Sequence, residues 1–248
     1  TLGNLGIAYS KKGEIDKAIK MQERALAIKE KHYGKTHLEL AHTLDALGQA
    51  YYKKGDWDKM LKLIGRAVEL QEKHLGKDHI ALAPKLGNLA NAYGLKNDMD
   101  KKISITERAL KLQEKYYGPD HVELAGTLDN LGSALCMKGD RANAIKYSKK
   151  ALKLKEKRYP ANHIELAATL GNLGIAYGEK EVDKLIEHLE RAQKILANHH
   201  GADHVELASS YDNLGYAYFL KKNYAKSVDL SERALKILEN KRGSEHPA

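Results

Sequence analysis

The chain repeats one phrase about every 42 residues, and this period limits its possible folds more than any other feature. TLGNLGIAY begins at Thr1, and related phrases begin at Thr43, Lys85, Thr127, Thr169 and Ser210. Repeats of this length build solenoids, in which each unit buries its apolar face only by stacking on its neighbours. We therefore predict one continuous domain over residues 1–248, with repeats 1–42, 43–84, 85–126, 127–168, 169–209 and 210–248.

Apolar residues at helical spacing predict two helices, A and B, in each repeat. On helix A of the first repeat, Leu2, Leu5, Gly6 and Tyr9 share one side. Six such pairs predict an all-α chain of about twelve helices. The B helices are expected to begin near Ile15, Trp57, Met99, Arg141, Val182 and Tyr224 and to end at Gly34, Gly76, Gly118 and Gly201.

The starts of the A helices carry capping signals. Asp120 and Glu123 have the spacing of a capping box, with an acceptor at the N-cap and Glu three residues later. The same spacing recurs at Thr36/Glu39, Asn162/Glu165 and Asp203/Glu206. A cap at Asp78 would place Pro84 inside the third A helix, where a proline should kink the axis between Ile80 and Pro84. A one-residue deletion around Glu179–Val182 predicts a shorter turn in the fifth repeat.

Within the unit, Leu5-Gly6, Ala8-Tyr9, Gly13-Glu14, Ala18 and Ala25-Leu26 resemble the signature of the tetratricopeptide repeat. The 42-residue length, with H-x-E-L-A between units, is similar to the array of kinesin light chains and their relatives. The resemblance covers the whole chain. It implies a right-handed superhelical solenoid of antiparallel helix pairs, with the A helices lining a concave groove. It also implies an adaptor role in protein binding and no enzymatic activity.

Composition further limits the class of protein to which the chain can belong. The single cysteine, Cys136, excludes a disulfide scaffold and fits a reducing, cytoplasmic compartment. No apolar run approaches membrane-spanning length. Chemistry that needs a cofactor is not expected, because the glycines recur at the repeat period and form no phosphate-binding loop. The chain starts in mid-repeat without Met, so we interpret it as part of a longer protein.

The formal charge of +9 is uneven, and the fourth repeat is the most basic. Its B helix carries Lys146, Lys149, Lys150, Lys153, Lys155, Lys157 and Arg158. We interpret these side chains as a solvated outer face, so a nucleic-acid partner is not expected.

Six histidines occur once per repeat, at His37, His79, His121, His163, His204 and His246. Because they lie one repeat apart, they form a row and not a metal-binding cluster. His199, His200 and His204 come closer together, but His204 occupies the position that every repeat keeps. No metal site is predicted.

The fourth residue of each repeat reads Asn4, Ala46, Asn88, Asn130, Asn172 and Asn213. A helix turns about 100° per residue, which places this position opposite the Leu-Tyr core side. Asn is a mediocre residue for a helix interior, and its amide can bond a peptide N–H and C=O together. The column either holds an extended peptide or bonds neighbouring helices across the repeat junctions. Relatives of this repeat family show such an asparagine ladder.

Neighbouring positions on the same face would give selectivity. They include Lys11, Gln49 and Lys53 in the first two repeats. Further along the chain they are Asn91, Leu95, Ser133, Met137 and Tyr216. The hypothesis is a peptide or protein partner with acidic residues at one end and apolar residues further along.

The residue before the Asn column alternates between Gly and Asp, as Gly3, Asp45, Gly87, Asp129, Gly171 and Asp212. The glycines either allow close backbone approach at every second repeat or record the duplication of a repeat pair. Two other functions remain open for the chain: a self-associating array joined through open repeat ends, and a sensory module of a larger regulator or effector.

Overall fold

The computed structural model describes residues 1–201 and 204–245, and within them the chain forms twelve α-helices, three 3-10 helices and no strand. The A helices are α1 (Leu2–Lys11), α3 (Leu40–Lys54), α5 (Leu82–Leu95), α7 (Ala125–Met137), α9 (Ala167–Tyr177) and α11 (Glu206–Leu220). The B helices are α2 (Ile15–Tyr33), α4 (Trp57–Leu75), α6 (Met99–Tyr117), α8 (Arg141–Arg158), α10 (Val182–His200) and α12 (Tyr224–Glu245). The all-α prediction and the starting residue of every B helix are confirmed.

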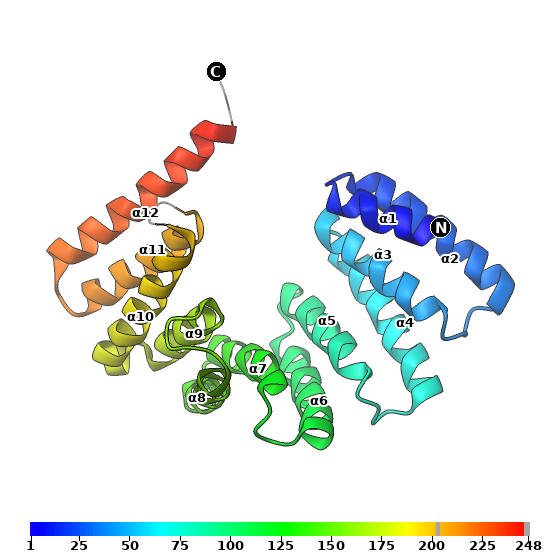
Figure 1. Ribbon diagram of the computed structural model, residues 1–248, viewed down its shortest axis with the longest axis horizontal. Coiled ribbons are helices and arrows are strands. Elements are labelled where there is room, and N and C mark those ends of the chain that lie inside the picture. Colours follow the sequence, from blue (N-terminus) through cyan, green and yellow to red (C-terminus); the bar gives the residue numbers. More distant parts are fainter. Residues whose placement is uncertain (202–203, 246–248) are drawn as a thin grey trace. The chain divides into compact units, whose positions relative to one another are not determined.

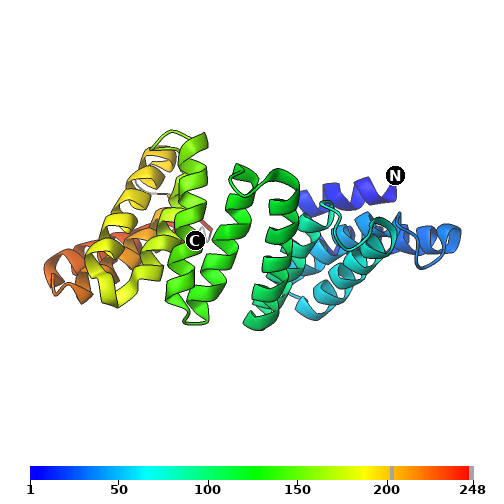
Figure 2. The same cartoon turned by 90° about the horizontal axis from the view of Figure 1, so that it is seen from below.

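The chain divides into two compact units, Thr1–Pro119 and Asp120–Ala248. Unit 1 holds α1 to α6 and unit 2 holds α7 to α12. In each unit the helices form antiparallel pairs that stack one after another (Figures 1 and 2). The single domain over 1–248 stays a prediction.

Apolar residues of both the A and the B helices form the core of each unit. Within a unit, each A helix packs against its own B helix and, where one precedes it, the B helix of the preceding pair. Leu40, Leu44 and Ala67 pack together in unit 1, and Leu166, Leu170 and Ile195 do so in unit 2. These are the positions that recur in every repeat, so the period in the sequence becomes a continuous series of buried junctions.

Glycines end four of the B helices, as predicted. Gly34, Gly76, Gly118 and Gly201 are their C-caps, with φ between 82° and 87°. Residues with a side chain rarely adopt this conformation, whereas glycine does so without a steric penalty. In the fourth repeat an extended residue, Tyr159, follows the B helix instead.

The A helices start differently from the prediction, and the recurring histidine is the reason. His37, His79, His121, His163 and His204 each accept, at Nδ1, a hydrogen bond from the backbone N–H two residues later. The imidazole therefore caps this turn, in place of the predicted side chains of Thr36, Asp120 and Asn162. Asp203 and His246 lie outside the described residues. Short 3-10 helices, η1 (Val122–Leu124) and η2 (Ile164–Leu166), then lead into α7 and α9.

The predicted kink at Pro84 is wrong, because the helix begins later than expected. A turn holds His79 to Ala81, and α5 starts at Leu82. Pro84 is the third residue of the helix, where the backbone N–H would have no partner within the helix. The proline therefore removes no hydrogen bond of the helix, and no complete helical turn precedes it.

The deletion in the fifth repeat shortens its A helix and not the turn, which corrects that prediction. The helix α9 has 11 residues against 13 in α7, and residues 178–181 separate it from α10, whereas only residues 138–140 separate α7 from α8. Helix α9 ends at Tyr177, and the 3-10 helix η3 (Gly178–Glu181) connects it directly to α10. None of the helices in the described part of the chain is both long and apolar enough to cross a membrane.

Candidate peptide-binding surface

In each unit the A helices lie next to one another and share one surface. In unit 1, α1 contacts α3, and Asp45 of α3 bonds Lys85 and Asn88 of α5. In unit 2, α7 contacts α9, and α9 and α11 line a common pocket. We call the exposed surface of α1, α3 and α5 the A face of unit 1, and that of α7, α9 and α11 the A face of unit 2 (Figure 1).

The asparagine column lies on these faces, but its members do not share one environment. Asn4, Asn130 and Asn213 are exposed, and Asn88 and Asn172 are half-buried. Among the described hydrogen bonds, only Asn88 of the column has a partner, Oδ1 of Asp45 at 3.1 Å across the repeat junction. Asn88 is therefore structural, whereas the other four amides have bonding capacity left for a ligand.

Asp45 is the centre of a polar cluster at the junction of α3 and α5. The residue is buried, and its carboxylate accepts hydrogen bonds from Nζ of Lys85, Nδ2 of Asn88 and Nε2 of Gln49. We call these four residues the Asp45 plug. A buried carboxylate is tolerated because a cation and two amides satisfy it.

Asp129 is in the same position two repeats later and forms a second cluster. Its Oδ2 accepts hydrogen bonds from Oγ1 of Thr169 at 2.6 Å and Nζ of Lys155 at 2.9 Å. The Lys155 ammonium also donates to Oγ1 of Thr169 at 2.8 Å. All three residues are buried, and we call them the Asp129 plug. Its cation comes from a B helix, whereas the cation of the Asp45 plug comes from the next A helix.

The glycines that alternate with these aspartates do not serve close backbone approach, which corrects that expectation. A Cβ atom at Gly3, Gly87 or Gly171 would have no neighbouring atom within 4 Å. Gly3 and Gly171 instead line pockets on the A faces.

The pocket at Gly171 lies between α9, α10 and α11 and has a volume of about 360 Å³. Two members of the asparagine column, Asn172 and Asn213, line it together with Ser209, Ser210 and Glu206. The apolar part of the lining includes Ile175, Leu189, Ala192 and Leu196. Leu189 and Ala192 are buried and form its floor, while Ile175 and Asn213 are exposed at its mouth.

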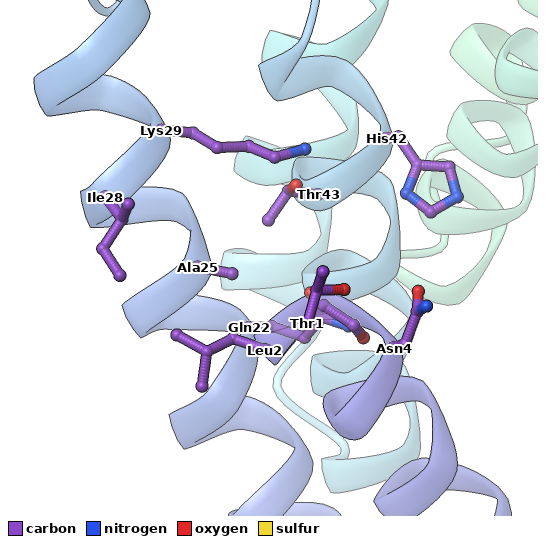
Figure 3. Close-up of a pocket in the computed structure, with 10 residues that line it drawn as sticks. Thr1, Leu2, Asn4, Gln22, Ala25, Ile28, Lys29, His42 and Thr43 are labelled. Carbon is purple, nitrogen blue, oxygen red and sulfur yellow. The ribbon is translucent and has the colours of Figure 1, made fainter.

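The pocket at Gly3 lies between α1, α2 and α3 and also has a volume of about 360 Å³. Figure 3 shows Lys29 extending from α2 toward Thr43, with Asn4 and His42 on the other side of the pocket. Nζ of Lys29 donates to the Glu39 carbonyl at 3.1 Å, so its charge has no carboxylate partner among the described contacts. This pocket is therefore more positive than the one at Gly171, whose lining includes Glu206.

The residues expected to give selectivity lie on the A helices, and they differ in exposure and in hydrogen bonding. Lys11, Asn91, Leu95 and Met137 are exposed, and Ser133 is half-buried. Gln49 belongs to the Asp45 plug. Lys53 donates to the carbonyl of Ser10 at 2.8 Å, and Tyr216 donates to Oε1 of Glu179 at 2.8 Å. That hydrogen bond raises the pKa of Tyr216 above its usual range.

The histidine cluster near the end of α10 repeats a packing motif found elsewhere in the chain. The rings of His200 and His204 are stacked, with centroids 4.4 Å apart, as are those of Tyr159 and His163 at 4.5 Å. Nε2 of His200 lies 3.1 Å from a Glu206 carboxylate oxygen, so three potential ligands are close together. However, Nδ1 of His204 already accepts the helix-capping bond, and parallel stacked rings do not direct their lone pairs at one point. The stacked rings and the capping bond of His204 are therefore the contacts by which other repeats also pack this turn.

The basic helix α8 differs from the predicted solvated face at two residues, of which Lys150 is half-buried. Lys146, Lys149, Lys153, Lys157 and Arg158 are exposed, but Lys155 is buried in the Asp129 plug. Sequence reasoning missed both plugs. The alternation of Asp with Gly at the third residue of each repeat is the feature of the sequence that could have located them.

The comparisons with known proteins agree with this architecture. The tetratricopeptide repeat pattern matches residues 1–59, 86–157, 124–181 and 165–240, and a second version of it matches residues 40–81. No curated protein sequence matches the chain.

Solved structures of similar fold include BtubC (BKLC) from P. vanneervenii, at 23% identity and a TM-score of 0.75, covering 94% of each chain. A putative kinesin light chain from Podosopora anserina with nearly identical TPR-like repeats has 21% identity and a TM-score of 0.69. That match covers 80% of this chain and 95% of the other. The apo form of RapI, at 14% identity, has a TM-score of 0.72 and covers 97% of this chain and 83% of its own.

At these identities the likeness concerns the fold, and the family follows from the repeat pattern, which covers most of the chain. The chain belongs to the tetratricopeptide repeat family, in a form whose structural neighbours include kinesin-light-chain-like repeat proteins.

Proposed function

We propose that the chain is a protein-interaction scaffold or adaptor that binds extended peptide segments of partner proteins on its A faces. Tetratricopeptide repeats are generally protein-interaction modules, so the class of function agrees with the family. The observation that supports this particular surface is the asparagine column, since Asn4, Asn130, Asn172 and Asn213 keep free amides there. Each amide offers one acceptor and two donors, which suits a peptide backbone of any sequence.

The neighbouring side chains would select among peptides. On the A face of unit 1, Lys29 and His42 line one pocket with Asn4, and Lys11 is exposed about two turns further along α1. These basic groups favour acidic ligand residues. On the A face of unit 2, Met137, Ile175 and Tyr216 are exposed, which favours apolar ligand residues.

Selection of linear peptides from a displayed random library would test the proposal. We expect enriched peptides to lose binding to an Asn130/Asn172/Asn213→Ala variant whose circular dichroism matches the wild type. Asn88→Ala is the matched control, because Asn88 already bonds Asp45 and should affect stability more than binding. Equal binding by the wild type and the triple variant would contradict an asparagine-mediated mode.

Self-association is a second candidate, favoured by the terminal helix. On α12, Val228, Leu235 and Leu238 are about half exposed and lie along one side at helical spacing. Light scattering over a range of concentrations distinguishes the candidates: growing oligomers support an array, and a constant monomer supports peptide binding.

A further inference from the structure

The Asp129 plug and the Gly171 pocket occupy corresponding places in successive repeats. Asp129 is the third residue of the fourth repeat, and Gly171 is the third residue of the fifth. Lys155 is the fifteenth residue of α8, and Leu196 is the fifteenth residue of α10. Thr169 and Ser210 are the first residues of the following repeats. The same junction is therefore closed by three polar side chains in one repeat and open in the next.

The open junction differs from the closed one in chemistry as well as in volume. Replacement of Asp by Gly removes the carboxylate, and replacement of Lys by Leu196 removes the ammonium. What remains is the buried apolar floor of Leu189 and Ala192, lined further by the half-buried Leu196 and by Asn172 and Asn213. Among the described residues of the lining, Glu206 is the one that carries a charge, and its carboxylate faces His200.

We propose that the third residue of each repeat decides whether the junction accepts a ligand side chain, and that the Gly171 pocket binds a large apolar side chain of an extended peptide. This inference rests on the proposed function, because Asn172 and Asn213 would hold the peptide backbone on either side of the anchor. The buried apolar floor favours aliphatic or aromatic groups. Glu206 disfavours an acidic anchor, and no basic residue offsets it in the part of the lining that the structure describes. A junction closed by a plug offers a ligand only the side-chain amides of the asparagine column.

The unit 1 junctions follow the same rule. The Asp45 plug fills the junction between α3 and α5, and the pocket at Gly3 opens between α1 and α3. Lys29 lies in that second pocket, so the two open pockets differ in the ligand side chain that they suit.

A blocked tripeptide, acetyl-Gly-Leu-Gly-amide, is a suitable probe, because it combines backbone amides with one apolar side chain. Its binding can be followed by methyl NMR of Ile175, Leu189 and Leu196 and by the side-chain amides of Asn172 and Asn213. We expect saturable shifts at these groups. We also expect roughly tenfold or more weaker binding when Ala replaces Leu, since several buried methyl and methylene groups are lost. With Glu in place of Leu, no shifts are expected.

Two variants close the pocket in different ways. Gly171→Asp/Leu196→Lys rebuilds the plug of the preceding repeat beside Ser210, and Gly171→Leu fills the space with an apolar side chain. Both should abolish the preference for Leu over Ala, and the second variant adds no buried charge that could prevent folding. Asn172→Ala/Asn213→Ala is the comparison variant, which removes the backbone contacts and keeps the pocket.

The outcomes separate the two proposals. Loss of the Leu preference in the pocket variants, with their helicity intact, supports the anchor pocket. Unchanged Leu binding in Gly171→Leu overturns it, as do equal affinities for the Leu and Ala tripeptides or no saturable shifts with the Leu tripeptide. If only the asparagine double variant loses binding, the anchor pocket is wrong and the backbone-binding mode stands. If only the pocket variants lose binding, the anchor pocket stands and the role of these asparagines is wrong.

Discussion

Nζ of Lys155 lies 2.9 Å from Oδ2 of Asp129, and both residues are buried at the junction of α7, α8 and α9. Asp129→Ala would leave the ammonium of Lys155 without its carboxylate. Removing one partner of a buried pair costs about 3–5 kcal/mol of unfolding free energy, because the remaining charge is uncompensated. Urea denaturation followed by circular dichroism measures the loss.

Two further variants serve as controls for this prediction. Asp129→Ala/Lys155→Met removes both charges and should recover most of the lost stability. Asp183→Ala breaks the exposed pair between Lys221 and Asp183 and should have a much smaller effect, because water screens that pair. A loss in Asp129→Ala no larger than that in Asp183→Ala would contradict a structural role for the buried pair.

Two helical glycines should respond in opposite ways to the same substitution. A Cβ atom at Gly132 would lie 2.5 Å from Oγ of Ser148, whereas one at Gly171 would meet nothing within 4 Å. Gly132→Ala should therefore destabilise the chain by about 1–3 kcal/mol through overpacking. Gly171→Ala should stabilise it by roughly 0.5–1 kcal/mol, because alanine is the better helix former. Thermal and urea unfolding of the two variants would check the signs, and a stabilised Gly132→Ala would refute the packing argument.

His163 caps the turn before α9 and also stacks on Tyr159, and two substitutions separate these contributions. Asn can accept the capping bond from the Glu165 N–H but cannot stack in the same way. His163→Asn should therefore lose the stacking contribution, about 0.5–1.5 kcal/mol. His163→Ala should also lose the capping hydrogen bond, which lowers the unfolding free energy by about 1 kcal/mol more. Equal unfolding free energies for the Asn and Ala variants would show that the Nδ1 bond contributes nothing.

Tyr51 should make the stability of unit 1 depend on alkaline pH. The pKa of Tyr51 is raised from 10.0 to about 12. Burial of the side chain is the largest cause, and the second is the hydrogen bond from its hydroxyl to Glu23 at 2.7 Å. A group with a raised pKa stabilises the folded state fully below its unfolded pKa, and this contribution is lost as the pH rises from about 10 to about 12. The stability difference between the wild type and Tyr51→Phe should shrink over that interval. A difference that is constant with pH would contradict the raised pKa.

Local signals in the sequence predicted the features that depend on neighbouring residues. The 42-residue period identified the repeat, and the glycines marked the ends of the B helices because their positive φ excludes most other residues. The starts of the A helices were less accurate. Asp120 with Glu123 fits a capping box, but the imidazole of His121 is the acceptor that the turn uses. The kink expected at Pro84 failed for the same reason, since a later helix start places the proline in the first turn.

The sequence by itself determined the all-α repeat, its family and the row of asparagines on one side of the A helices. The tertiary structure decided which of those asparagines are free and which junctions are open. Asn88 is occupied because the Asp45 carboxylate reaches it from the preceding repeat, a contact between residues 43 positions apart. Lys155 is buried because its place on α8 faces Asp129 and Thr169, whereas Leu196 in the same place on α10 leaves a pocket. The physical reason is that each junction is built from three helices, so a single residue acquires its role only from the side chains that the next repeat brings to it.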